Sequence, residues 1–282
     1  MNSKRYKKDR IFKYLTVAAT SFSVFILCAL LYHIAHTGFS WVSWDFLNRF
    51  PSRFPQKAGI KAAIWGSLWI MGLTTLIAVP LGVATAVYLQ EYAKKGMFVR
   101  LLQVNIANLA GMPSIIYGLL GLAVFVRFLG LDRSILAGAL TLTLLVLPVI
   151  IIASQEAIRA VPREVKLGAY ALGARRWQTI TGQILPAALP GIMTGVILSL
   201  SRAIGETAPL IMVGALSYVA FVPESVNDPF TVLPLQIFNW AGRPQEEFHS
   251  LAAAAIIVLL LVLFSMNFVA IFIRQRFQRY RL

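Results

Sequence analysis

Two opposite charges, four residues apart, interrupt the apolar stretch Leu200-Ser201-Arg202-Ala203-Ile204-Gly205-Glu206-Thr207. A charged side chain at the centre of a bilayer costs about 2.5–3.5 kcal/mol even on a lenient insertion scale, so it persists where it is paired, faces water or has a function. Positions i and i+4 share one face of a helix, which allows Arg202 and Glu206 to form an ion pair. The stretch therefore predicts either a lock between helices or a contact for a transported ion.

The composition indicates the class of protein. Of the 282 residues, 58% are hydrophobic and 13% are charged, and the mean hydropathy is +0.73. A soluble domain needs more charge to cover its surface, so we expect an integral membrane protein. The net charge of +15 lies in short segments between apolar runs, which favours membrane topology over nucleic-acid binding as its cause. One cysteine, Cys28, and three scattered histidines predict neither a disulfide nor a metal site.

Six apolar runs are long enough to cross a membrane as helices, which takes about 20 residues each. The sequence therefore predicts an all-α membrane protein with six transmembrane helices. The second and fifth runs exceed one bilayer thickness, so we expect them to tilt, kink or extend beyond the lipid. The runs cover about residues 14–35, 62–89, 105–126, 134–154, 186–220 and 250–273.

The positive charges orient these spans. Six spans put both ends of the chain on one side, which holds 18 lysines and arginines against seven on the other. Because cytoplasmic loops carry the positive excess, both termini are predicted to be cytoplasmic, although residues 36–61 place four positive charges outside. We expect a basic cytoplasmic N-terminus (1–13), one transmembrane domain (14–273) with a long cytoplasmic loop (155–185), and a basic cytoplasmic tail (274–282).

The loop of residues 155–185 is the longest cytoplasmic segment. Its middle, residues 167–174, is small and apolar, between Lys166 and the pair Arg175-Arg176. A helix of small residues ended by glycine allows another protein to approach its backbone. Arginines beside Trp177 could equally hold such a helix on anionic lipid. Composition leaves both partners open, another protein and membrane lipid.

The spacing within this loop resembles the coupling loop of ABC importer permeases, which reads Glu-Ala-Ala, three residues, Gly, nine residues, Ile-x-Leu-Pro. The second alanine, the glycine, the leucine and the proline of that pattern are present as Ala169, Gly173, Leu185 and Pro186. The glutamate, the first alanine and the isoleucine are replaced by Leu167, Gly168 and Gln183. The resemblance implies a contact with an ATPase, to which we also assign the neighbouring Ala174, Arg175 and Arg176.

Three further stretches resemble the permease subunits of the Pst phosphate transporter. They are Gly59–Leu68 with Ala78–Val83 and Tyr88–Ala93, Asn108–Leu119, and Arg202–Thr207. Together they cover about residues 59–210, and the Glu-Thr-Ala-Pro continuation is more similar to the A subunit than to the C subunit. The resemblance implies the architecture of a type I ABC importer permease, which moves phosphate across a bacterial plasma membrane by alternating access.

The same resemblance implies the partners. They are a second permease subunit, an ATPase dimer and an extracytoplasmic phosphate-binding protein. The chain contains no Gly-x-x-x-x-Gly-Lys-Ser/Thr loop, so we expect ATP and Mg²⁺ to bind the partner ATPase and this chain not to be an enzyme.

Arg202 suits an oxyanion because its guanidinium is permanently charged and presents forked donors. Glu206 can hold the guanidinium when no anion is bound, and a paired arginine can release what it binds. The predicted substrate path consists of this pair, the flanking Ser201 and Thr207, and three neutral donors on another span. Those donors are Asn108, Ser114 and Tyr117, each of which could instead make an ordinary interhelical hydrogen bond.

Four alternatives compete with this interpretation. The pair could lock helices together, or the anion could be sulfate or molybdate, which one arginine does not distinguish from phosphate. A secondary carrier would require inverted repeats and broken helices in both halves, neither of which is evident. A membrane scaffold would not need either charge. The spacing of Gly191, Gly195 and Ser199 predicts close helix packing rather than a substrate contact.

Overall fold

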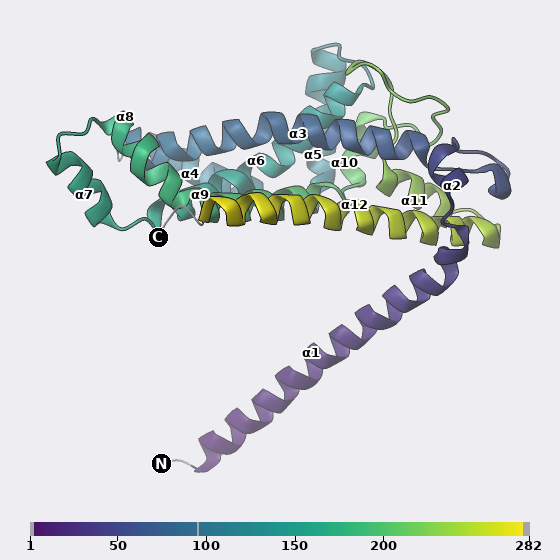
Figure 1. The fold of residues 1–282 in the computed structure, drawn as a ribbon, viewed down its shortest axis with the longest axis horizontal. Helices are drawn as coiled ribbons and strands as arrows, with labels where there is room; N and C mark the ends of the chain where they lie inside the picture. Colours follow the sequence, from purple (N-terminus) through teal and green to yellow (C-terminus); the bar gives the residue numbers. More distant parts are fainter. Residues whose placement is uncertain (1–2, 95, 279–282) are drawn as a thin grey trace.

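The computed structural model describes residues 3–94 and 96–278, so residues 1–2 and 279–282 of the predicted basic ends lie outside it. The described residues form helices joined by loops (Figure 1). The helices are α1 (Ser3–Gly38), α2 (Trp44–Asn48), α3 (Lys61–Val87), α4 (Met97–Ala110), α5 (Ser114–Gly121), α6 (Ile135–Arg159), α7 (Arg163–Ala171), α8 (Arg176–Thr179), α9 (Leu185–Ala203), α10 (Ala208–Val213), α11 (Leu233–Ala241) and α12 (Glu246–Gln278). Wider π-helical turns follow α3 at Tyr88–Tyr92, α5 at Leu122–Phe128 and α8 at Ile180–Ile184.

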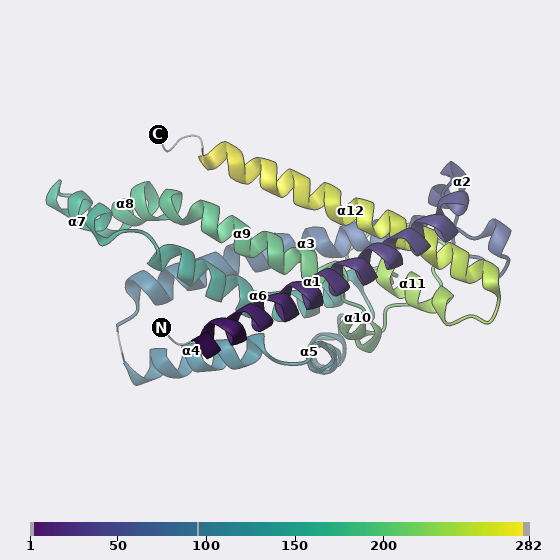
Figure 2. The same ribbon diagram turned by 90° about the horizontal axis from the view of Figure 1, so that it is seen from below.

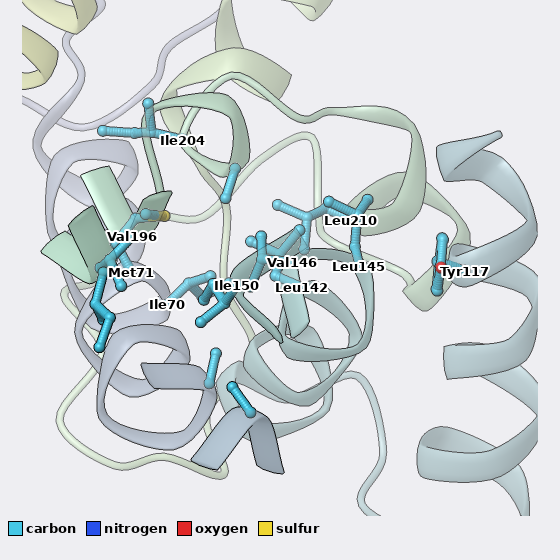
Figure 3. Close-up of a cluster of buried hydrophobic side chains, with 14 of the residues drawn as sticks. Ile70, Met71, Tyr117, Leu142, Leu145, Val146, Ile150, Val196, Ile204 and Leu210 are labelled. Carbon is cyan, nitrogen blue, oxygen red and sulfur yellow. The ribbon is translucent and has the colours of Figure 1, made fainter. Parts of the chain in front are cut away.

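The centre of the bundle is formed by α3, α6 and α9, whose apolar side chains meet in one cluster (Figure 3). Helix α6 is the most enclosed of the long helices, with 67% of its apolar window buried. Its residues Leu142, Val146 and Ile150 lie one helical turn apart and face Ile70 of α3 and Val196 of α9. This spacing places one side of α6 in the core, as expected for a helix surrounded by other helices.

Helices α6 and α9 approach each other closely because glycines face alanines between them. A Cβ added at Gly195 would lie 2.3 Å from Cβ of Ala153, and one added at Gly191 would lie 2.8 Å from Cβ of Ala157. Ser199 is buried and donates a hydrogen bond to its own helix at the Gly195 carbonyl, 2.8 Å away. The predicted packing role of this small-residue spacing is confirmed.

Within residues 3–94 and 96–278, five single helices and one bent pair are long and apolar enough to cross a membrane, which gives six spans when the pair counts as one. The all-α, six-span prediction is therefore confirmed. The third span is not the continuous helix predicted over residues 105–126. Instead α4 and α5 meet at 106° around Gly111-Met112-Pro113. Pro113 has no N–H to continue the helical ladder, and hydropathy alone does not register such a break.

The fifth span also differs from its prediction. We expected residues 186–220, whereas the helical span runs from Arg176 to Ala203 and stops. A short helix, α10, follows after a non-helical stretch of residues 204–207 and ends at Gly214. The apolar residues beyond Ala203 therefore do not extend a single long helix.

Helix α1 projects away from the bundle and contacts it near its own C-terminal end (Figure 1). None of its apolar window is buried. At the contact, a Cβ on Gly38 would lie 2.6 Å from the backbone of Ala253 in α12. Helix α1 begins, and α12 ends, toward the same end of the molecule as α7 and α8 (Figure 1). We call this the connector end, because it carries the connector, which is the segment between α6 and α9 (residues 160–184).

The opposite end of the molecule carries α2, α11 and the longer loops. A second apolar cluster holds them together, with Trp240 of α11 lying between Phe46 of α2 and Phe248 of α12. Ser43 caps α2 by accepting a hydrogen bond from the Phe46 N–H at 3.1 Å. This cluster ties the long loops to the helices that they connect.

Candidate functional site

The two broken spans meet each other in the bundle. A Cβ added at Gly118 of α5 would lie 2.7 Å from Cα of Pro209 and 2.8 Å from Cβ of Met212, both in α10. The segments beyond each break are therefore packed together, and both breaks lie beside this contact. Non-helical backbone at membrane depth is tolerated where it is enclosed by protein or lines a water-filled path. The break in the third span was not predicted, whereas the fifth run was expected to tilt, kink or extend beyond the lipid; together the two breaks make this region the candidate site.

Arg202 and Glu206 form the predicted ion pair across one of these breaks. Nε of Arg202 donates to Oε1 of Glu206 at 3.2 Å. The side chains are 52% and 16% exposed, respectively. Arg202 lies in the last turn of α9, while Glu206 lies beyond its end, so the prediction that both occupy one continuous helix is wrong. After Ala203 the chain forms a turn, in which the N–H of Glu206 bonds to the Ala203 carbonyl at 3.1 Å, and this turn keeps the two side chains together.

The bonding of the guanidinium leaves part of it open. Its Nε faces Glu206, and no hydrogen bond within the described part of the chain engages its two terminal nitrogens. Among those residues the pair also bonds to no other helix. An arginine held in this way still presents two donors in a fixed plane, the arrangement that binds carboxylate or phosphate oxygens.

Ser201 and Thr207 flank the pair in different surroundings. The hydroxyl of Ser201 lies 2.6 Å from Oδ1 of Asn267 and links α9 to α12. Thr207 is half-buried at the start of α10, where its side chain makes no capping bond. A role for either residue in the substrate path remains a prediction.

The three predicted neutral donors lie around the other break. Tyr117 of α5 is buried and donates from its hydroxyl to the Leu109 carbonyl at 2.6 Å, which satisfies an acceptor freed where α4 ends. Asn108 is exposed and Ser114 is half-buried, and among the described residues no side-chain hydrogen bond joins either one to the Arg202 pair. Tyr117 thus supports the break, and a contact of Asn108 or Ser114 with an anion remains a prediction.

The connector between α6 and α9 is folded around α7. Gly173 adopts the left-handed conformation at φ +82°. The N–H of Gly173 bonds to the Tyr170 carbonyl at 2.9 Å, and the N–H of Ala174 reaches back to the Ala169 carbonyl at 3.0 Å. These two bonds form a Schellman motif, which favours glycine at this position because other residues are strained there.

After this turn the chain returns directly into the fifth span. The N–H of Arg175 bonds to Oε1 of Gln178 at 2.8 Å and fixes the start of α8. The π-helical turn at Ile180–Ile184 then joins α8 to α9, which begins with Leu185 and Pro186. Because Pro186 lacks an N–H, it cannot continue a regular ladder, and a widened turn accommodates it. The last part of the connector and Arg202 therefore lie on one helical element, Arg176–Ala203.

A second ion pair, which the sequence interpretation missed, ties the connector to the end of α3. Lys166 of α7 pairs with the carboxylate of Glu91, whose side chain is 6% exposed. Arg176 donates to the backbone carbonyl of Glu91, and its guanidinium lies 4.9 Å from the ring centre of Tyr92. One feature of the sequence could have indicated this pair. Glu91 is a lone carboxylate at the end of an apolar run, and it lies within residues 88–93, which resemble phosphate permeases.

The family of this chain follows from comparison with known proteins. Residues 78–279 match the family described as "Binding-protein-dependent transport system inner membrane component". The chain belongs to this family. It is therefore a multi-pass membrane component of a transport complex that includes other subunits, as members of the family are.

Individual relatives agree with this assignment. A phosphate transport system permease protein PstA of Pasteurella multocida is 32% identical, over 96% of each chain. A PstA 1 of Mycobacterium tuberculosis is 36% identical over 72% of this chain and 66% of that relative, slightly under two thirds of its length. The crystal structure of a bacterial ABC transporter involved in alginate import matches with a TM-score of 0.68 at 18% identity, covering 97% of this chain and 98% of that one. The fold of a type I ABC importer permease is thereby confirmed.

Proposed function

We propose that this family member is a permease subunit of an ATP-driven importer that moves inorganic phosphate across a bacterial plasma membrane. The observation that carries the proposal is the Arg202–Glu206 pair beside two broken spans. Its guanidinium is half-exposed and has two terminal nitrogens without a partner among the described residues. Relatives named as phosphate transport permeases, one of them matching 96% of the chain, support phosphate as the anion and the A-type subunit as the closer counterpart.

The pair provides both capture and release. An incoming phosphate places two oxygens against the free terminal nitrogens of Arg202, which form charge-assisted hydrogen bonds with it. Glu206 remains within reach of the guanidinium and competes for it, so the anion is not held permanently. Conduction requires such moderate binding, since a site that binds too firmly does not empty. A lock between helices of this chain is disfavoured because the pair bonds within one segment.

The connector carries the apolar surface expected at an ATPase contact. Leu167, Leu172 and Trp177 are 64%, 90% and 64% exposed, although they lie on a basic segment. Large exposed apolar groups of this kind mark sites of protein contact. We assign this surface to a partner ATPase, which binds ATP and Mg²⁺. The predicted coupling residues from Ala169 to Arg176 form the turn that presents it.

Two structural connections can transmit a movement of the connector to the anion site. The Lys166–Glu91 pair and the Arg176–Tyr92 stack join it to the end of α3. The helical element Arg176–Ala203 joins it to the last turn of α9, where Arg202 lies. Closure of the ATPases would therefore tilt α3 and α9 together, and such rigid-body motion is what alternating access requires.

The remaining partners follow from surfaces that this chain does not cover itself. Helix α1 is exposed along its apolar window and is suited to packing on a second permease subunit or on lipid. The connector end holds the positive excess, so we place it and both termini in the cytoplasm. The opposite end, with α2 and α11, then faces an extracytoplasmic phosphate-binding protein.

Labelled phosphate uptake at low external phosphate tests this function. Cells that lack the chain are compared with cells that carry it, in the presence of unlabelled phosphate, sulfate or molybdate as competitor. We expect uptake to require the chain and to be suppressed by phosphate alone. Suppression by sulfate or molybdate at equal concentration would assign the other oxyanion, and uptake independent of the chain would refute the proposal.

A further inference from the structure

A cavity at the connector end is lined by arginines and lies away from the Arg202 pair. Its volume is about 660 Å³, and it opens between the end of α3, the start of α4, the end of α6 and the start of α7. The lining contains Arg100, Arg159 and Arg163 and no carboxylate. Figure 2 shows that α4 begins near the same end of the bundle as α7.

Two of the three arginines are not neutralised within the part of the chain that the structure describes. Arg159 pairs with Glu156 on its own helix at 2.9 Å. The side chains of Arg100 and Arg163 make no ion pair or hydrogen bond among those residues, and the nearby Glu91 is already paired with Lys166. Like charges that converge without a counter-ion repel one another, so an anion bound between them lowers the free energy of the site.

The surface beside the cavity is apolar. Helix α4 has no buried residue, and Met97, Leu101 and Val104 are 81%, 56% and 50% exposed. Met97 also lines the cavity, so the arginine-rich space continues into an apolar helix face. A phosphate group with acyl chains attached fits both parts at once, whereas a free inorganic ion would leave the apolar face uncovered.

We infer that this cavity binds the headgroup of an anionic phospholipid, with its acyl chains lying along α4. Basic pockets between transmembrane helices at the cytoplasmic surface are suited to such headgroups. The bound lipid would fill the space between α4 and the α6–α7 corner, next to the Lys166–Glu91 pair. The assignment to the cytoplasmic leaflet rests on the orientation given under Proposed function, but the cavity and its charges do not.

The test is lipid binding by the assembled transporter, measured by native mass spectrometry with added phosphatidylglycerol or phosphatidylcholine. We expect Arg100→Gln/Arg163→Gln to weaken phosphatidylglycerol binding at one site per chain by roughly 30-fold, since each arginine near an anionic lipid surface contributes about fivefold. The matched double variant Arg127→Gln/Arg276→Gln removes two exposed arginines outside the cavity and should bind like the intact complex. Equal binding by the cavity variant, or equal retention of phosphatidylcholine, would overturn the proposal.

A photoreactive residue at Gln103, which lines the cavity, gives a local readout in the otherwise intact complex. We expect it to crosslink phosphatidylglycerol, and millimolar inorganic phosphate not to displace the lipid. Displacement by phosphate would assign the cavity to the free anion and contradict a lipid site. Phosphate uptake that does not depend on the chain, with the lipid crosslink present, would count against the proposed function alone, so the two failures are distinguishable.

Discussion

Two ion pairs, one at the end of α9 and the other between α7 and the end of α3, differ in almost every respect. Arg202 and Glu206 are four residues apart in sequence, and their side chains are 52% and 16% exposed. Lys166 and Glu91 come from different helical elements, and the Glu91 side chain is 6% exposed. A pair that is open to solvent contributes little stability and exchanges partners readily. A pair with an enclosed carboxylate strongly resists the loss of one partner. We interpret the first as a binding device and the second as a mechanical link.

The largest effect should come from removing the cation of the open pair. Arg202→Gln keeps the length of a polar side chain but removes the charge, and a hydrogen bond to a charged group contributes about 1.5–3 kcal/mol. We therefore expect phosphate uptake to fall by about 10- to 100-fold, measured with labelled phosphate at matched membrane levels. Arg127 is exposed and its side chain has no hydrogen-bond or ion-pair partner in the described part of the chain, so Arg127→Gln is the control and should transport normally. Loss of the assembled complex in Arg202→Gln would instead favour a structural lock.

The next effect concerns the link between α7 and α3. Glu91→Gln leaves Lys166, which is one-third exposed, without its counter-ion. The α7–α3 contact should weaken by roughly 1–3 kcal/mol, less than for a fully buried pair. Uptake by the reconstituted complex should fall about tenfold while ATP hydrolysis continues. The reversal Glu91→Lys/Lys166→Glu should recover part of the coupling, and full coupling in Glu91→Gln would show that the link is dispensable.

A smaller effect is expected from the anionic partner of Arg202. Glu206→Gln removes the competitor for the guanidinium, and exposed pairs contribute at most about 1 kcal/mol. The KM for phosphate should fall by up to about fivefold, with a lower maximal rate because release slows. Initial rates over a range of phosphate concentrations measure both quantities. A higher KM would mean that Glu206 supports binding rather than competing with it.

The smallest effect is expected from a variant that changes the backbone conformation of the connector and leaves its charged side chains unchanged. Gly173→Ala places a side chain at φ +82° and should destabilise the turn by about 1 kcal/mol, although no atom within 4 Å obstructs it. Gly168→Ala in α7 also meets open space, at an ordinary helical position, and should leave stability unchanged or slightly raised. Uptake and thermal unfolding of the complex should decrease for Gly173→Ala alone. An equal response in the two variants would contradict the role of the left-handed turn.

Hydropathy predicted the number of spans, because the long apolar runs can be read directly from the sequence. The small-residue spacing at Gly191 and Gly195 predicted the α6–α9 contact, because close approach requires residues of that size. The Arg202–Glu206 pair was predicted from helical periodicity and is present, even though the helix ends at Ala203. A local turn can preserve the contact that a regular helix would have made.

The features that were missed depend on distant contacts or on backbone breaks. The break at Gly111-Met112-Pro113 lies in an apolar run that hydropathy treats as continuous, and membrane helices often tolerate proline. The partners Glu91 and Lys166 lie on segments that share no local pattern, and the packing of α3 against the connector brings them together. Sequence periodicity registers neighbours on one helix and does not register such pairs.

The central claim is that the open nitrogens of Arg202 bind the transported anion. Electron cryomicroscopy of the assembled transporter, loaded with phosphate and held with an inactive ATPase, tests it directly. The account predicts phosphate oxygens within hydrogen-bonding distance of the terminal nitrogens of Arg202, with Glu206 close by. Phosphate bound elsewhere in the transmembrane region, with Arg202 turned away from it, would contradict the account.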